Sequence, residues 1–120
     1  MKRVPCVLHA DRRSIPLVLA LLDDPAQRSQ GYRGRLPPQD DHEGLLFLWP
    51  EVTRSRFDMR GVPFDLELVV GSPDGRVTGC CRMPGNSTSL FCPVDPFRFA
   101  VELKAGWASR NGVPSRLELA

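Results

Sequence analysis

Three acidic residues, Asp58, Asp65 and Glu67, lie close together in a segment that is otherwise largely apolar. Asp65 and Glu67 are two positions apart, so a strand here would project both carboxyl groups from one face, roughly 7 Å apart at the backbone. If that face is sheltered, repulsion between the two carboxylates raises the pKa of one of them, which yields an acid or base near neutral pH. We therefore predict Asp58, Asp65 and Glu67 as catalytic residues for cofactor-free acid–base chemistry, such as an isomerisation or a cyclisation.

Asp65 and Glu67 also have a simpler interpretation. A half-buried strand of an antiparallel sheet turns its polar residues to water, and the two acids would then form that solvent face. The direction of their side chains decides between the two interpretations.

Arginine and aromatic side chains near the acids could hold a ligand. Arg35 and Arg60 could supply counter-charge or bind an anionic group through paired hydrogen bonds. The alternatives are a salt bridge in a turn for Arg35 and places in the core for the aromatic residues. The full set that we predict to bind a ligand is Arg35, Trp49, Phe57, Met59, Arg60 and Phe64.

Other classes of site have little support in the sequence. The cysteines Cys6, Cys80, Cys81 and Cys92 include no C-x-x-C pair, and neighbouring strand residues point to opposite faces, so we predict reduced thiols and no metal site. The two histidines have no partner nearby in the sequence, and no Ser-His-Asp order or phosphate loop is present. We expect no cofactor.

Composition narrows the class of protein. A chain of 120 residues fits one domain, residues 1–120, with enough length for one core. The net charge is only +2, and the 14 arginines and 2 lysines are scattered, so we expect no nucleic-acid partner. The most apolar run, residues 15–22, is far shorter than the roughly 20 residues of a membrane helix. Because the N-terminus also lacks the apolar core of a signal peptide, we expect a cytoplasmic protein without a membrane partner. The oligomeric state is not indicated.

The elements that must position these residues are short. The 12 prolines favour short elements joined by tight turns. Asp24 as N-cap and Pro25 as first helical residue predict a helix that ends at Gly31, and a second helix is predicted over 105–111. The runs that predict strands are residues 4–9, 15–22, 44–49, 56–60, 64–70, 76–81, 97–103 and 117–119. Short strands separated by turns predict a mainly β fold, a compact antiparallel β-sandwich or small barrel with two short flanking helices.

Several separated segments together resemble one family. They are Leu21–Arg28 with Gly31–Arg35, Gly44–Pro50, Phe57–Phe64, Asp74–Val77 and Val101–Gly112. In this order and at this spacing they resemble the bacterial and archaeal domain of unknown function 192. The resemblance implies a mostly antiparallel β domain of sandwich or barrel type and no particular activity.

The segment after Phe64 departs from the family's pattern. Members of that family usually continue with Pro-Leu-Asp, whereas this chain reads Asp65-Leu66-Glu67, so an acid stands where the proline is usual. Asp58 is likewise an acid where an aromatic or small polar residue is usual. We therefore predict a domain that binds a small polar molecule in a pocket at the mouth of the β domain. The alternative is a protein-interaction module without chemistry, docking through a strand edge or residues 91–99.

Overall fold

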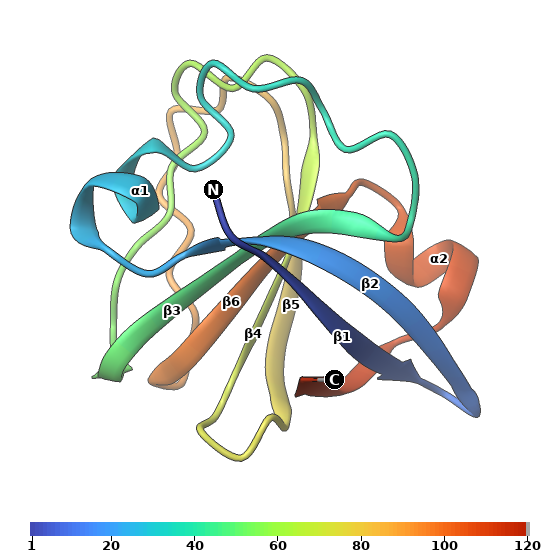
Figure 1. Cartoon of the computed structure of the whole chain (residues 1–120). Coiled ribbons are helices and arrows are strands. Elements are labelled where there is room, and N and C mark those ends of the chain that lie inside the picture. Colours follow the sequence, from blue (N-terminus) through green and yellow to red (C-terminus); the bar gives the residue numbers. More distant parts are fainter. Residues whose placement is uncertain (120) are drawn as a thin grey trace.

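Seven strands form one curled sheet with two short helices outside it (Figure 1). The computed structural model describes residues 1–119. The elements in chain order are β1 Arg3–Ala10, β2 Arg13–Leu22, α1 Pro25–Gln30, β3 Glu43–Thr53, β4 Leu66–Gly71, β5 Val77–Met83, β6 Phe97–Lys104, α2 Trp107–Asn111 and β7 Pro114–Leu119. Within this part of the chain, neither helix is long and apolar enough to cross a membrane.

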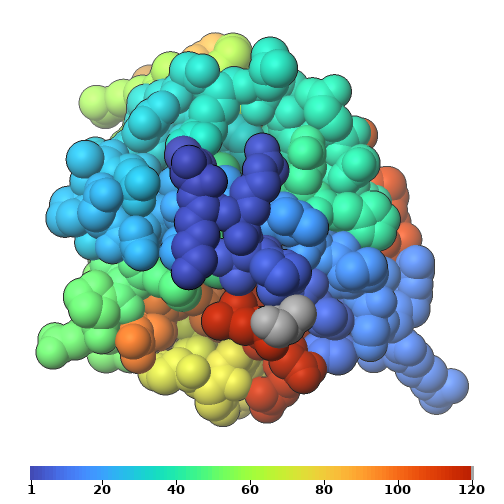
Figure 2. Space-filling view, viewed as in Figure 1, coloured from blue at the N-terminus to red at the C-terminus, as the bar shows by residue number. Residues whose placement is uncertain are grey.

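The sheet is a half-barrel with the strand order β5-β4-β6-β3-β2-β1-β7. Its curl brings the two edge strands together, where Arg76 forms a bridge with Arg116 and the Leu117 amide donates to the carbonyl of Gly75 at 2.8 Å. In the space-filling view the N-terminal residues lie directly above the C-terminal strand (Figure 2), in keeping with the pairing of β1 with β7. The predicted mainly β fold with two short helices is confirmed.

One strand pair differs from the expected antiparallel pattern. β2 and β3 are parallel, whereas the other neighbouring pairs of the sheet are antiparallel. A parallel connection must carry the chain back to the end from which it started, and α1 with residues 31–42 makes that return across one face of the sheet.

The two faces of the sheet bury different residues. Inside the curl lies a core that includes Leu8, Leu17, Val69, Val101 and Trp107. On the opposite face a second core, which includes Phe47, Met59, Leu68 and Phe97, is covered by Tyr32 and by residues 57–62. Strands in the middle of the sheet are therefore buried on both faces, as the burial of β4 along its whole length shows.

Residues 54–65 connect β3 to β4 and do not form the strands that the sequence predicts there. The predicted strand at 56–60 is wrong, because this segment crosses over the outer core and makes only an isolated bridge between Phe57 and Phe91. The predicted start of the next strand at Phe64 is also too early, since β4 begins at Leu66. β3 continues past Pro50 to Thr53, although the sequence predicts its end at Trp49. The register between β3 and β6 shifts after Leu48, so Pro50, which has no N–H to donate, lies outside the regular ladder of hydrogen bonds.

Candidate functional site

Asp65 and Glu67 are held by separate partners rather than facing one another. Asp65 lies just before β4, pairs with Arg82 and accepts a hydrogen bond from the Gly85 amide at 2.8 Å. The hydrogen bond from Arg82, with that from the Gly85 amide, holds the pKa of Asp65 below its usual value, so Asp65 is not the acid with the raised pKa that was predicted for one of the pair.

Glu67 lies within β4, and its carboxylate caps the start of α2. It accepts hydrogen bonds from the Gly106 amide at 3.1 Å and the Ala108 amide at 3.0 Å. The predicted solvent-facing alternative is wrong for Glu67, which is only 7% exposed because β4 lies inside the sheet. Catalytic roles for Asp65 and Glu67 stay predictions, and both carboxylates are engaged in holding the fold.

Asp58, Phe57 and Met59 line a cavity of about 130 Å³ on the outer face of the sheet. The cavity lies between α1 with the turn after it, the segment 56–62, and strands β3 and β6. Its lining residues are Arg28, Ser29, Gly31, Tyr32, Arg33, Phe47, Arg56, Phe57, Asp58, Met59, Val62 and Glu102. We call this cavity the Glu102 pocket.

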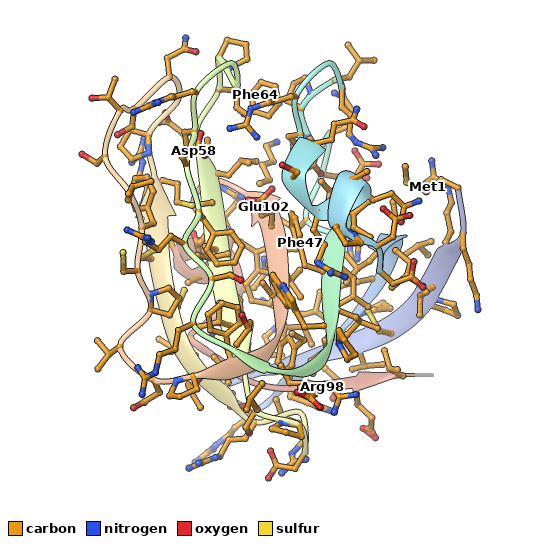
Figure 3. The ribbon with its side chains drawn as sticks, turned by 90° about the vertical axis from the view of Figure 1, so that its left-hand side faces the viewer. Met1, Phe47, Asp58, Phe64, Arg98 and Glu102 are labelled. Atoms are coloured by element: carbon orange, nitrogen blue, oxygen red, sulfur yellow. The ribbon has the colours of Figure 1, made fainter. Side chains whose placement is uncertain are left out.

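Glu102 is the buried polar group of this pocket. It comes from β6, where it lies between Leu45 of β3 and Leu68 of β4, and it is only 5% exposed. In Figure 3 its side chain points into the space between α1 and the segment that carries Asp58. Within residues 1–119, no protein group makes a hydrogen bond with its carboxyl, and the charge of Arg33 is the nearby influence on it.

Burial sets the protonation state of Glu102. Loss of hydration raises the pKa of this carboxyl to about 8, although the charge of Arg33 opposes the rise. At neutral pH the group is therefore mostly the uncharged acid, which can both donate and accept a hydrogen bond.

The turn after α1 forms one wall of the pocket. Helix α1 begins because the side chain of Asp24 accepts from the Gln27 amide at 2.8 Å and Pro25 follows the cap, as predicted. It ends at Gly31, whose φ of 52° and ψ of −129° suit a residue without a side chain. The turn can therefore approach the sheet closely beside Glu102.

Arg33 ties this turn to the segment across the pocket. Its guanidinium pairs with the carboxylate of Asp58 and donates to the backbone oxygens of Arg60 at 2.6 Å and Ser29 at 2.9 Å. The Asp58 carboxylate also accepts from the Arg60 amide at 3.1 Å. Asp58 thus holds the pocket's shape, and its charge is compensated by Arg33.

Aromatic side chains form the apolar wall. The rings of Phe47 and Phe57 meet edge to face with centroids 5.9 Å apart, and Trp49 packs behind both of them. The guanidinium of Arg28 lies 5.5 Å from the centre of the Trp49 ring, and Arg28 donates to the Leu48 carbonyl at 2.8 Å. Trp49 thus supports the pocket without lining it.

A family model described as "Uncharacterized ACR" and named DUF192 matches residues 7–118. The chain belongs to the DUF192 family. No curated protein has a sequence that matches it.

Solved structures share the fold of this DUF192 domain. A candidate transcription regulator from Sinorhizobium meliloti 1021 is similar with a TM-score of 0.91 and 24% identity, over 98% of this chain and 94% of that one. A protein of unknown function from Novosphingobium aromaticivorans DSM 12444 is similar with a TM-score of 0.88 and 20% identity, over 98% of this chain and 84% of that one. At these identities the likeness supports the fold alone.

Besides Trp49, three more of the residues predicted to bind a ligand do not line the pocket of this DUF192 domain. Arg35 donates to the carbonyl of Gly31 at 2.8 Å, from the far side of the turn. Phe64 packs edge to face on Tyr32 with ring centroids 5.7 Å apart, and the side chain of Arg60 is exposed.

The sequence analysis missed Glu102, and the reason lies in the pattern of β6. Arg98, Ala100, Glu102 and Lys104 alternate with apolar residues, so the pattern indicates that Glu102 faces water. In the structure this face of the sheet is covered near Glu102 by the turn after α1 and by residues 56–62. The small residue Gly31 directly after the predicted helix is the one signal of a close approach there.

No metal site accompanies the pocket in the part of the chain that is described. Among residues 1–119, no three His, Cys, Asp or Glu side chains are grouped so that they could hold an ion.

Proposed function

We propose that this DUF192 protein binds a small polar molecule in the Glu102 pocket, with the Glu102 carboxyl as the group that orients the bound molecule. A largely buried carboxyl that faces a cavity and has no hydrogen-bond partner among residues 1–119 carries this proposal. Among residues 1–119 no fully buried side-chain oxygen or nitrogen lacks a hydrogen-bond partner, so the Glu102 oxygens are reached by solvent in the pocket. A polar group in such a pocket takes its hydrogen bonds from water or from a bound molecule. A bound molecule with a polar atom at this position supplies the missing partner.

The same group suits acid–base chemistry without a cofactor. A carboxyl whose pKa is about 8 exchanges its proton readily near neutral pH, as a general acid or base must. In this proposal Glu102, rather than Asp65 or Glu67, moves a proton on the bound molecule, as in an isomerisation. Both of the other acids already accept hydrogen bonds from the fold.

The test is a binding screen by ligand-observed NMR with small carboxylates, amides, alcohols and hydroxy acids. We expect one or more of them to bind, and Glu102→Gln to weaken binding by at least about tenfold. Asp65→Asn is the matched control, because Asp65 lies outside the pocket, and it should bind like the native protein. Binding that is equal in native and Glu102→Gln protein would contradict the proposal.

The acid–base step has its own readout. If Glu102 removes a proton from carbon, a bound hydroxy or oxo acid should exchange that hydrogen for deuterium in D₂O, in the native protein and not in Glu102→Gln. If the molecule binds but its hydrogen is not exchanged, the catalytic part of the proposal is wrong and the binding part stands.

The alternative function, a protein-interaction module, has one observation in its favour. A groove of about 340 Å³ runs between β5 and residues 90–94, and beside it Leu90 is 51% and Val94 is 90% exposed. A partner captured from native lysate in stoichiometric amount, lost with Val94→Asp and kept with Glu102→Gln, would favour this alternative.

A further inference from the structure

The charges around the Glu102 pocket are unequal. Three arginines, Arg28, Arg33 and Arg56, line it. The carboxylate of Asp58 pairs with the guanidinium of Arg33, and among residues 1–119 neither Arg28 nor Arg56 has an ion pair. Arg56 is exposed and, within residues 1–119, takes part in no side-chain hydrogen bond or ion pair. The mouth of the pocket therefore presents uncompensated positive charge.

The inner end of the pocket does not oppose an anion. Because burial keeps Glu102 mostly protonated at neutral pH, it adds no negative charge there and can donate a hydrogen bond to an acceptor oxygen. Between the inner end and the mouth, Phe47, Phe57 and Met59 offer a surface for carbon atoms. The pocket thus has a hydrogen-bonding end, an apolar middle and a cationic mouth.

We infer that the molecule bound in the Glu102 pocket is a small organic carboxylate, with its negative group at Arg56 and Arg28 and its carbon skeleton against Phe47 and Phe57. This inference rests on the proposed function and deepens it. An anionic group gains charge-assisted hydrogen bonds from guanidinium groups, whereas a cation is repelled by them. Inorganic phosphate has the charge but no carbon skeleton for the apolar middle.

The size of the cavity limits the skeleton. One water molecule takes up roughly 30 Å³ of the liquid, so a cavity of about 130 Å³ has room for about four to six non-hydrogen atoms. A whole nucleotide or peptide does not fit in this volume, and a charged group of a small molecule can extend beyond the mouth toward Arg56.

The experiment compares isobutyrate with isobutyramide, which has nearly the same shape and no charge, and with inorganic phosphate. Binding is followed by amide chemical shifts of ¹⁵N-labelled protein, at Gly31 and Arg33. We expect isobutyrate to bind at least about tenfold more tightly than isobutyramide. We expect Arg56→Gln to remove most of this difference. Arg54→Gln is the matched control, because Arg54 is an exposed arginine two residues away that does not line the pocket.

Each result has a separate meaning. If the amide binds as well as the acid, or if Arg56→Gln behaves like Arg54→Gln, the carboxylate inference is overturned. The proposed function then still stands if Glu102→Gln weakens binding of the amide. Phosphate binding as tightly as isobutyrate would show an inorganic anion site and would also overturn the inference. If none of the three probes shifts the Gly31 and Arg33 resonances, the inference fails, and the broader screen of neutral compounds separately decides the proposed function.

Discussion

Gly31 and Glu102 lie against one another across the wall of the pocket. A Cβ atom on Gly31 would stand 3.7 Å from Oε1 of Glu102 and 3.7 Å from Cζ of Phe47. These distances are ordinary contacts, so a side chain at Gly31 would meet no collision and would instead occupy space beside the buried carboxyl. The missing side chain at this position therefore keeps the inner end of the pocket open.

Gly31→Ala should destabilise the protein and also block the pocket. The φ of Gly31 is 52°, a value that costs a residue with a side chain about 1–3 kcal/mol. Gly34→Ala separates the two effects, because Gly34 also has a positive φ, of 75°, but has open space where its Cβ would stand. Urea unfolding should show a loss of stability in both variants, while isobutyrate affinity should fall only in Gly31→Ala. Equal affinity in the two variants would place the bound molecule elsewhere.

Glu102→Gln should change how stability depends on pH. The folded protein holds the Glu102 proton up to its pKa of about 8, whereas the ordinary value for this side chain is 4.5. The stability contributed by protonated Glu102 is thus complete below pH 4.5 and is lost as the pH rises through about 8. By linkage this amounts to an effect on the order of 5 kcal/mol.

The measurement is the free energy of unfolding in urea between about pH 5 and pH 9. Relative to the native protein, Glu102→Gln should gain stability as the pH rises. Asp41, Asp65 and Asp74 have lowered pKa values, so their contributions are lost only in more acidic solution and do not disturb this window. Parallel profiles for native and variant protein would contradict the assignment of Glu102 as a buried acid.

Arg33→Ala should weaken the fold and raise the pKa of Glu102 further. The variant loses the pairing with Asp58 and the hydrogen bonds to the carbonyls of Arg60 and Ser29, with an expected loss of about 1–2 kcal/mol because the side chain is partly exposed. It also removes the cation that lowers the Glu102 pKa. A ¹³C NMR titration of the carboxyl groups would show the rise, and Arg60→Ala, which changes an exposed side chain, should show none.

Glu67→Gln should lower stability without changing binding in the pocket. The two carboxylate oxygens accept from the Gly106 and Ala108 amides, and a glutamine can accept through only one oxygen while its NH₂ group faces the other amide. We expect a loss of about 2 kcal/mol in urea unfolding. If Glu67→Gln kept native stability but no longer bound isobutyrate, Glu67 would instead be a residue of the site, as the sequence predicts.

The four cysteines should differ in their reaction with thiol reagents. Burial raises the pKa of Cys6 to about 11, and burial together with Glu67, whose Oε2 is 3.7 Å from the thiol, raises that of Cys80 to about 12. Partial loss of hydration, with a further contribution from Glu67, also raises the pKa of Cys81. Cys80, Cys81 and Cys92 are all exposed, so the raised pKa values rather than access should slow the first two. Reaction with Ellman's reagent should therefore begin at Cys92, and Cys92→Ser should remove the fastest phase. A fast phase that persists in Cys92→Ser would show that one of the other thiols is activated.

Local signals were sufficient to predict most of the fold. The Asp24 cap with Pro25 set the start of α1, and the alternation through residues 66–70 places Leu66, Leu68 and Val70 in one core and Val69 in the other. The prediction of a strand at residues 56–60 was wrong for a physical reason. Phe57 and Met59 are spaced as in a strand, but their side chains pack into the outer core from a loop that crosses it. Alternating apolar residues show which side is buried and not whether a neighbouring strand is present.

The pocket was only partly predictable. Phe57, Asp58 and Met59 were found from the sequence and do line it, whereas Glu102 is more than 40 positions away from them. Glu102 is buried because the turn after α1 and residues 56–62 cover this face of the sheet. Such a contact between distant parts of the chain cannot be read from the local pattern of β6. Asp65 and Glu67 are adjacent in the alternating pattern, but the amides of Gly85, Gly106 and Ala108, far along the chain, determine what each carboxylate does.

β6 follows both β3 and β4 along the chain yet lies between them in the sheet. In the sheet it pairs with β3 on one side and with β4 on the other, and β3 and β4 share no ladder with each other. Since Glu102 belongs to β6, a chain that ends before Phe97 lacks the carboxyl at the inner end of the pocket. We expect such a truncated chain to lose both the joined sheet and any binding of isobutyrate.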